Sequence, residues 1–174
     1  FTVSNLEANA DAAGTSGIVT LAYTEVSDNA ASITTGSGAT TVSGTTSGDT
    51  LTINAASLSQ NTTLTESGEA QQVVNNLVGD ISATALTGTL KVTTGNAADN
   101  GISISTGTAN TTITSSGSGD TITVNADGMV DNTTLDINGS STFTVSNLEA
   151  NTDAAGTSGI VTLAYTDVSD NAAS

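Results

Sequence analysis

The chain has 174 residues, of which 17 are acidic, one is basic (Lys91) and none is cysteine, histidine, proline or tryptophan. The formal net charge of −16 makes nucleic acid and anionic membrane surfaces poor partners. The absence of cysteine excludes disulfides and thiolate metal sites, and the absence of histidine removes the usual general base, so we expect no enzyme. No apolar run reaches the length of a membrane span, so no membrane insertion is expected.

The most informative pattern is an internal repeat. Residues 1–32 return almost unchanged as residues 143–174, and the two differences are Thr152 in place of Ala10 and Asp167 in place of Glu25. We interpret the chain as a window onto a tandem array with a period of 142 residues, which begins and ends at arbitrary points of that array. Many near-identical copies are typical of a fibre or stalk rather than of an enzyme that needs one site.

A second period, half as long, lies inside the first. Residues 47–55 (SGDTLTINA) align with residues 118–126 (SGDTITVNA), and 18 of the 37 positions from Ser32 to Gly68 are identical to those 71 residues later. We therefore divide the chain into the end of one repeat (1–31), unit A (32–102) and unit B (103–173), while residues 143–174 also begin the next copy and overlap in sequence with 1–32. We call the 142-residue pair of units a copy, and residues 71 positions apart unit-equivalent.

Residues between the glycine-rich turns alternate with a period of two, which predicts short strands with one buried face. Glu7–Ser16 and its copy Glu149–Ser158 lack this pattern and are predicted as a surface loop or a short helical insertion. Glu69–Val78 has a helical pattern in isolation, but its unit-equivalent Ser140–Glu149 alternates, so both are predicted as strands. We predict about six strands per unit, with alternation at 18–23, 40–43, 49–54, 62–65, 90–93, 102–106, 111–114, 121–125, 133–137 and 142–146.

Short strands with few aromatic residues fit two all-β architectures. In a parallel β-solenoid (β-helix), the chain coils so that equivalent strands stack about 4.8 Å apart and each coil covers its neighbours. In tandem β-sandwich domains, each unit closes its own core. We predict the solenoid, because a 71-residue sandwich almost without aromatic residues would bury little apolar surface. Two or three coils per unit would give an axial repeat of roughly 20–30 Å for each copy.

Asparagines recur beside the turns at unit-equivalent positions, where stacked side chains form hydrogen-bonded ladders. The pairs are Asn54 with Asn125, Asn61 with Asn132, and Asn76 with Asn147. The alternative is that asparagine is a common turn residue and that the paired residues need not touch, because a unit holds more than one coil.

Acidic residues also recur in the turns, each next to glycine or asparagine. Carboxylate and carbonyl oxygens in such turns are ligands for a hard cation, so calcium is the candidate metal and the candidate cofactor. The competing interpretation is that these aspartates cap turns and face solvent. The candidate calcium ligands are Asp28, Asp49, Asp99, Asp120 and Asp170.

The long near-identical repeats, the bias to Thr, Ser, Asn, Gly and Asp, the acidity and the missing cysteine resemble the repeat regions of giant secreted surface proteins and adhesins of bacteria. The resemblance implies a structural protein outside the cell or at its surface, forming a fibre, stalk or matrix filament whose partners are neighbouring repeats or identical subunits. The alternative is an adhesin module that binds cell-surface glycans or other surfaces, with or without calcium. Its aromatic residues would be Phe1, Tyr23, Phe143 and Tyr165, although core filling is the preferred use of these side chains.

Overall fold

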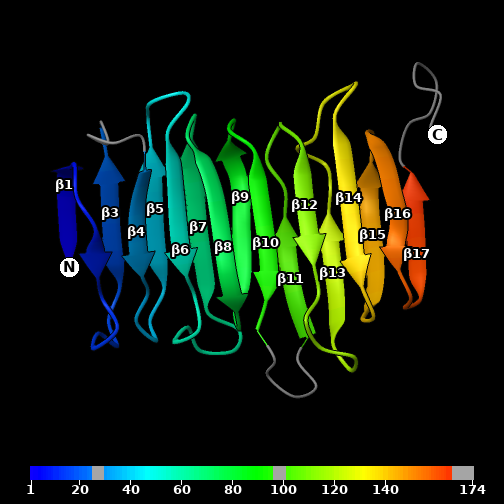
Figure 1. The fold of residues 1–174 in the computed structure, drawn as a ribbon, viewed down its shortest axis with the longest axis horizontal. Helices are drawn as coiled ribbons and strands as arrows, with labels where there is room; N and C mark the ends of the chain where they lie inside the picture. Colours follow the sequence, from blue (N-terminus) through cyan, green and yellow to red (C-terminus); the bar gives the residue numbers. More distant parts are fainter. Residues whose placement is uncertain (25–29, 96–100, 166–174) are drawn as a thin grey trace.

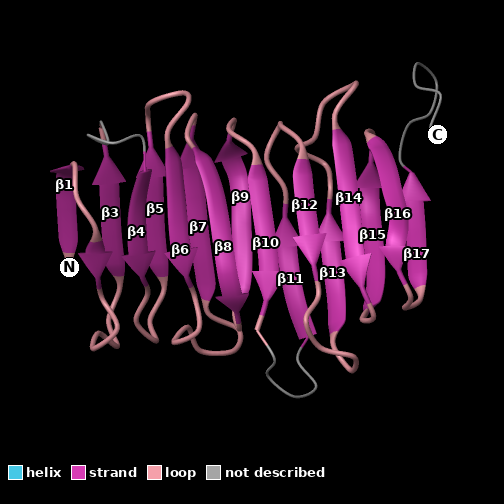
Figure 2. Ribbon diagram, in the orientation of Figure 1, coloured by secondary structure: helices cyan, strands magenta, loops and turns pink. Residues whose placement is uncertain are grey.

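The computed structural model of the chain describes residues 1–24, 30–95 and 101–165. Within these ranges every regular element is a β-strand, and no helix has the length and apolarity needed to cross a membrane (Figure 2). The strands form two parallel sheets. The odd sheet has nine strands: β1 (Thr2–Leu6), β3 (Val19–Tyr23), β5 (Thr40–Gly44), β7 (Thr63–Gly68), β9 (Asp80–Leu86), β11 (Gly101–Ser105), β13 (Thr121–Asn125), β15 (Thr142–Leu148) and β17 (Val161–Tyr165). The even sheet has eight strands: β2 (Ala10–Asp11), β4 (Ala30–Thr34), β6 (Thr50–Asn54), β8 (Gln71–Leu77), β10 (Leu90–Thr94), β12 (Thr111–Thr114), β14 (Thr134–Gly139) and β16 (Asn151–Thr157).

The chain visits the two sheets in turn, and this alternation makes it a parallel β-solenoid, as predicted. Two strands and their connections form one turn, and successive turns stack along the long axis (Figure 1). Paired residues such as Val19 and Thr40 are 21 positions apart, which is the length of one turn. The alternative of separate β-sandwich domains is wrong, because parallel ladders join each described turn to the next.

A thin core runs the length of the solenoid between the two sheets. In β6, Leu51 and Ile53 are fully buried, whereas Thr50 and Thr52 lie half-buried on the outer surface. Each buried aliphatic side chain contributes roughly 1.5–3 kcal/mol, and stability accumulates from turn to turn. Register places apolar residues over apolar residues, as in the inward column Ile33, Ile53, Val74, Val92, Ile113 and Ile137 of the even sheet.

Asparagine in a left-handed backbone conformation shapes one corner in each unit. Asn5, Asn76 and Asn147 have φ angles of 55°, 56° and 56°, and each stands one residue before the end of its strand. At each of them the strand has one residue more than its neighbour, which is a β-bulge. The bulge bends the strand and turns its last residue inward, so Leu77 and Leu148 are fully buried. Asparagine suits the position because it tolerates this conformation better than other side chains.

A unit occupies an odd number of strands. β4 and β11 are unit-equivalent, yet they lie seven strands apart and in different sheets. A unit therefore spans three and a half turns, and each residue is carried to the opposite side of the solenoid one unit later. A copy spans seven whole turns and returns to the same sheet, as β1 and β15 do. At about 4.8 Å per turn, the axial repeat of a copy is about 34 Å, which corrects the shorter repeat expected from two or three coils per unit.

The structure also corrects the number of strands, which is seven per unit rather than about six. Glu149–Ser158 contains the seven-residue β16, so the prediction of a loop or helical insertion is wrong there. Glu7–Ser16 is a loop, as predicted, apart from the two residues of β2. β9, which is unit-equivalent to β16, was missed as well. The inward side chain in the middle of β9 is Ala83, where other strands carry leucine, isoleucine or valine, so the apolar alternation is weak. The strand prediction for Glu69–Val78 is confirmed by β8.

Asparagine side chains do bond between turns, but not to their unit-equivalent partners. Asn76 Nδ2 donates to Asn54 Oδ1 at 3.2 Å, and Asn147 Nδ2 donates to Asn125 Oδ1 at 2.9 Å. Each contact joins neighbouring strands of one sheet, whereas Asn54 and Asn125 lie in opposite sheets. The same one-step contact therefore recurs on both sides of the solenoid.

Replacing Asn76 separates the backbone requirement from the side-chain hydrogen bond. Asn76→Ala forces a poorly suited residue to φ 56° and also removes the contact to Asn54, so it should lower the free energy of unfolding by about 1–2 kcal/mol. Asn76→Gly loses the contact but adopts the conformation freely, so it should cost less. Urea unfolding followed by circular dichroism measures both variants. Equal destabilisation by alanine and glycine would show that the left-handed backbone is not what the position demands.

Candidate functional site

Two of the five candidate calcium ligands lie in described parts of the chain. Asp49 and Asp120 directly precede β6 and β13, with 4% and 3% of their surface exposed. Their backbone carbonyls accept hydrogen bonds from Gln71 N at 2.9 Å and Thr142 N at 3.0 Å, which ties each turn to the next. Being unit-equivalent, the two aspartates belong to opposite sheets and do not form one site.

The other three candidate ligands, Asp28, Asp99 and Asp170, lie outside the described residues. Among the residues that are described, no group of three or more histidine, cysteine, aspartate or glutamate side chains could hold a metal ion. The calcium site therefore stays a prediction from the sequence.

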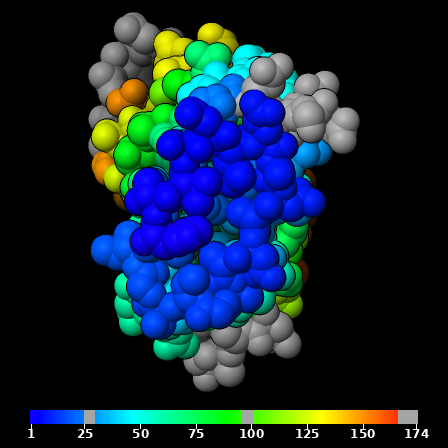
Figure 3. Space-filling view, turned by 90° about the vertical axis from the view of Figure 1, so that its left-hand side faces the viewer, coloured from blue at the N-terminus to red at the C-terminus, as the bar shows by residue number. Residues whose placement is uncertain are grey.

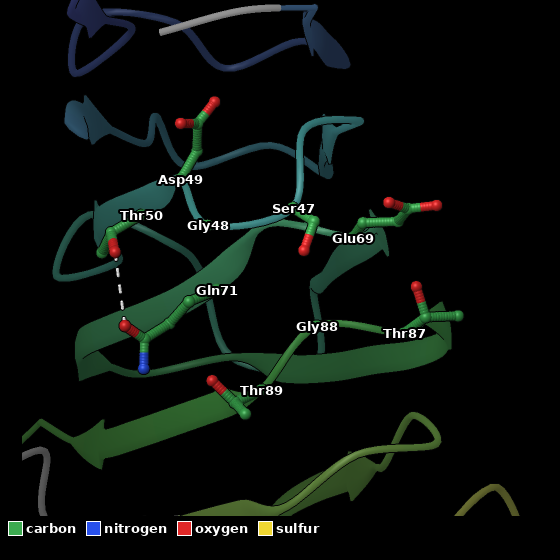
Figure 4. Close-up of a pocket in the computed structure, with 9 residues that line it drawn as sticks. All are labelled: Ser47, Gly48, Asp49, Thr50, Glu69, Gln71, Thr87, Gly88 and Thr89. Carbon is green, nitrogen blue, oxygen red and sulfur yellow. Dashed lines mark hydrogen bonds between the residues drawn. The ribbon is translucent and has the colours of Figure 1, made fainter. Parts of the chain in front are cut away.

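An open groove of about 370 Å³ crosses three successive turns of unit A. Its walls come from residues 47–50, from Glu69 and Gln71, and from residues 87–89. Thr50 Oγ1 donates to Gln71 Oε1 at 3.3 Å, and the carboxylate of Asp49 points away from this pair (Figure 4). Glu69 and Thr89 are replaced at the unit-equivalent positions by Ser140 and Ile160, so the lining is not repeated in unit B. The hydroxyl, amide and carboxylate groups of this groove offer hydrogen-bond donors and acceptors.

The outer face of the odd sheet is covered with hydroxyl side chains. Among the described residues, its outward positions carry one charge, Asp80, whose Oδ1 accepts a hydrogen bond from Ser103 N at 2.8 Å. One run of hydroxyl residues in register crosses the later strands, from β11 to β17, and comprises Ser103, Thr123, Thr144 and Thr162. Residues in register form the main run, which we call the hydroxyl column: Thr2, Thr20, Thr41, Thr65, Ser82 and Ser105.

The outer face of the even sheet differs, although its strands are unit-equivalent to those of the odd sheet. The residues that are unit-equivalent to the first five members of the hydroxyl column also stack in register. We call them the charged column: Val73, Lys91, Thr112, Asp136 and Asp153. Because a unit spans a half-integral number of turns, the two columns lie on opposite sides of the solenoid. The divergence between units has therefore made two chemically different faces.

Two long polar side chains lie among the inward-facing residues of unit A, in addition to shorter ones such as Thr40. Glu66 in β7 and Gln72 in β8 are both fully buried. Gln72 Nε2 donates to Ser67 O at 3.1 Å, but Gln72 Oε1 and both carboxyl oxygens of Glu66 have no hydrogen-bond partner. The unit-equivalent residues are Ile137 and Phe143, also fully buried. Our sequence analysis did not single out this pair, although the alignment of the units shows a carboxylic acid and an amide in place of two apolar residues.

Burial determines the protonation of Glu66. It raises the pKa of the carboxyl to about 8 from 4.5, because burial removes the water that would stabilise the charged form. The neighbouring strands contribute Val42 and Ala83 to the core beside it, and the single basic side chain, Lys91, is exposed on the outer face of the even sheet. Glu66 is therefore neutral at pH 7, which avoids a buried charge but leaves its polar atoms unpaired.

These features define an acidic parallel β-solenoid with a hydroxyl face and a charged face. The chain matches no protein-family model, no curated protein and no solved structure. The solenoid and its tandem units agree with a repeat region, which is the part of the resemblance that the fold supports.

Glu66 gives the solenoid a testable pH dependence. Between 4.5 and about 8 the folded chain binds a proton that the unfolded chain releases, so this contribution to stability is complete below pH 4.5 and is lost as the pH rises to about 8. Each unit of difference between the two pKa values corresponds to about 1.4 kcal/mol. Thermal unfolding followed by circular dichroism at a series of pH values measures the decline.

Two variants isolate the carboxyl. Glu66→Gln cannot titrate and should remove most of the decline, and Glu66→Ile, which installs the residue of unit B, should also raise stability at every pH above neutrality. A decline of unchanged size in the glutamine variant would assign it to other acidic residues.

Proposed function

We propose that this chain is a repeat segment of a structural fibre, stalk or matrix filament, located outside the cell or at its surface, in which copies stack into one continuous solenoid. The joint between copies carries the proposal. β15 and β17, which begin a second copy, pair as β1 and β3 do in the first: Leu148 lies opposite Tyr165 as Leu6 lies opposite Tyr23. β15 also pairs with β13 of the preceding copy in a five-residue ladder. One copy thus follows another without a linker and without a change of face.

This arrangement suits a load along the axis. Interstrand hydrogen bonds of both sheets connect each turn to the next, so many bonds share a pull along the solenoid. Each turn also covers the apolar residues of its neighbours, and the array gains stability by nearest-neighbour contacts rather than from one closed core. The formal charge of −16 keeps such a filament soluble and opposes random aggregation.

The alternative of a glycan-binding adhesin module receives no support from the aromatic residues. Tyr23 and Phe143 are 1% and 0% exposed, so they fill the core. Phe1 and Tyr165 are 75% and 39% exposed; Phe1 precedes β1 and Tyr165 ends β17, which are the two edge strands of the odd sheet. Figure 3 shows the end of the solenoid that the first residues of the chain form. The same residues one copy away, Phe143 and Tyr23, are buried where strands lie on both sides of them, so the exposure of Phe1 and Tyr165 follows from their edge position rather than from a sugar-binding platform.

The fibre proposal is tested by changing the number of copies. Chains of one and three copies should differ in their urea midpoint, with the longer chain more stable, because a larger share of its turns has two neighbours. Electron microscopy should show particles that lengthen by about 34 Å per added copy. Equal midpoints together with bead-like particles would contradict a continuous solenoid.

A further inference from the structure

We propose that the outer face of the odd sheet pairs two copies of this chain side by side, with hydroxyl column against hydroxyl column. The first argument is the distribution of charge. Two chains that each carry a formal charge of −16 repel one another, and the repulsion is weakest where acidic side chains are absent. Among the described residues, the odd sheet presents Asp80 alone on its outer face, whereas the even sheet presents Asp11, Lys91, Asp136 and Asp153.

The second argument is the chemistry of the face. A threonine or serine hydroxyl both donates and accepts, so two facing hydroxyl arrays satisfy each other without any other group. The side chains are short and lie in straight rows, and the methyl groups of Thr20, Thr41 and Thr65 add apolar contact between them. Among the described residues of this face, a charged partner would find Asp80 as the single charge, whereas a second copy presents the same hydroxyls in the same rows.

The third argument is the area. Nine strands about 4.8 Å apart, each about 17 Å long, give a face of roughly 700 Å², so a pair would bury about 1,400 Å². This exceeds the roughly 1,000 Å² that specific interfaces need. Because a copy spans whole turns, the face stays on one side of a longer array and grows with each copy.

The test measures association with variants matched between faces. Thr41 and Thr112 are unit-equivalent, half-buried and outward-facing, in the odd and even sheets respectively. Sedimentation velocity of the chain over a range of concentrations should show a monomer–dimer equilibrium that salt strengthens by screening the net charge. Thr41→Asp should weaken dimerisation at least about tenfold, because it places two carboxylates in the interface, and Thr112→Asp should leave it unchanged.

Circular dichroism checks that each variant is folded. If Thr41→Asp does not fold, Thr123→Asp in β13 with its matched control Thr52→Asp in β6 repeats the comparison. A chain that stays monomeric at every concentration and salt, or equal effects of the two members of a matched pair, would overturn the proposal. So would a monomer that binds an insoluble neutral polysaccharide through Thr41, which would assign the face to glycans. The pairing depends on the proposed fibre only in that the face grows with each added copy. A chain that stays monomeric would therefore not affect the test that compares one and three copies.

Discussion

The arrangement of the repeats depends on one constraint of parity: each unit supplies seven strands, an odd number, whereas each turn of the solenoid holds two strands, one in each sheet. Because seven strands make three and a half turns, a residue and its unit-equivalent lie on opposite sides of the solenoid. The units are therefore related by a half-turn about the axis combined with a shift along it, and the copy is the shortest segment that restores both sheet and sequence. Stacking, the outer faces and the contacts between turns all follow from this relation.

Some features are the same in units A and B, and others differ between them. The asparagine bulges recur in every unit because each corner needs the same backbone, whichever sheet it joins. The core is less uniform, since Glu66 and Gln72 occupy inward positions where the other unit has Ile137 and Phe143. A solenoid tolerates this difference because a turn packs mainly against its neighbours, so a weaker turn stays local. Unit A thus carries a local weakness inside an otherwise regular stack.

The sequence predicts those parts of the structure that depend on local pattern. Strands with alternating large apolar residues, such as β6 and β13, are recognisable because Leu51 and Ile53, or Ile122 and Val124, mark one face. β9 and β16 were not predicted because Ala83 and its unit-equivalent Ala154 stand in the middle of the two strands, where other strands carry a large apolar residue. Pairing with neighbouring strands rather than local pattern makes them strands. The number of turns per unit depends on these strands, so the axial repeat and the asparagine partners could not be derived. The two faces could not be foreseen either, since they require knowing that unit-equivalent residues lie on opposite sides.

The same parity explains why the array repeats as a pair of units. An array of identical units would present the same residues on both sides, so no face could differ from the other. Divergence between units A and B is the only route to two faces, and it must then be preserved in every copy so that each face stays continuous. The sequence has this hierarchy: residues one copy apart differ at two of 32 positions, whereas 18 of 37 residues one unit apart are identical. Similarity is high where residues share a face and low where they lie on opposite faces. The contrast between the hydroxyl column and the charged column is thus expected to recur with each copy of seven turns.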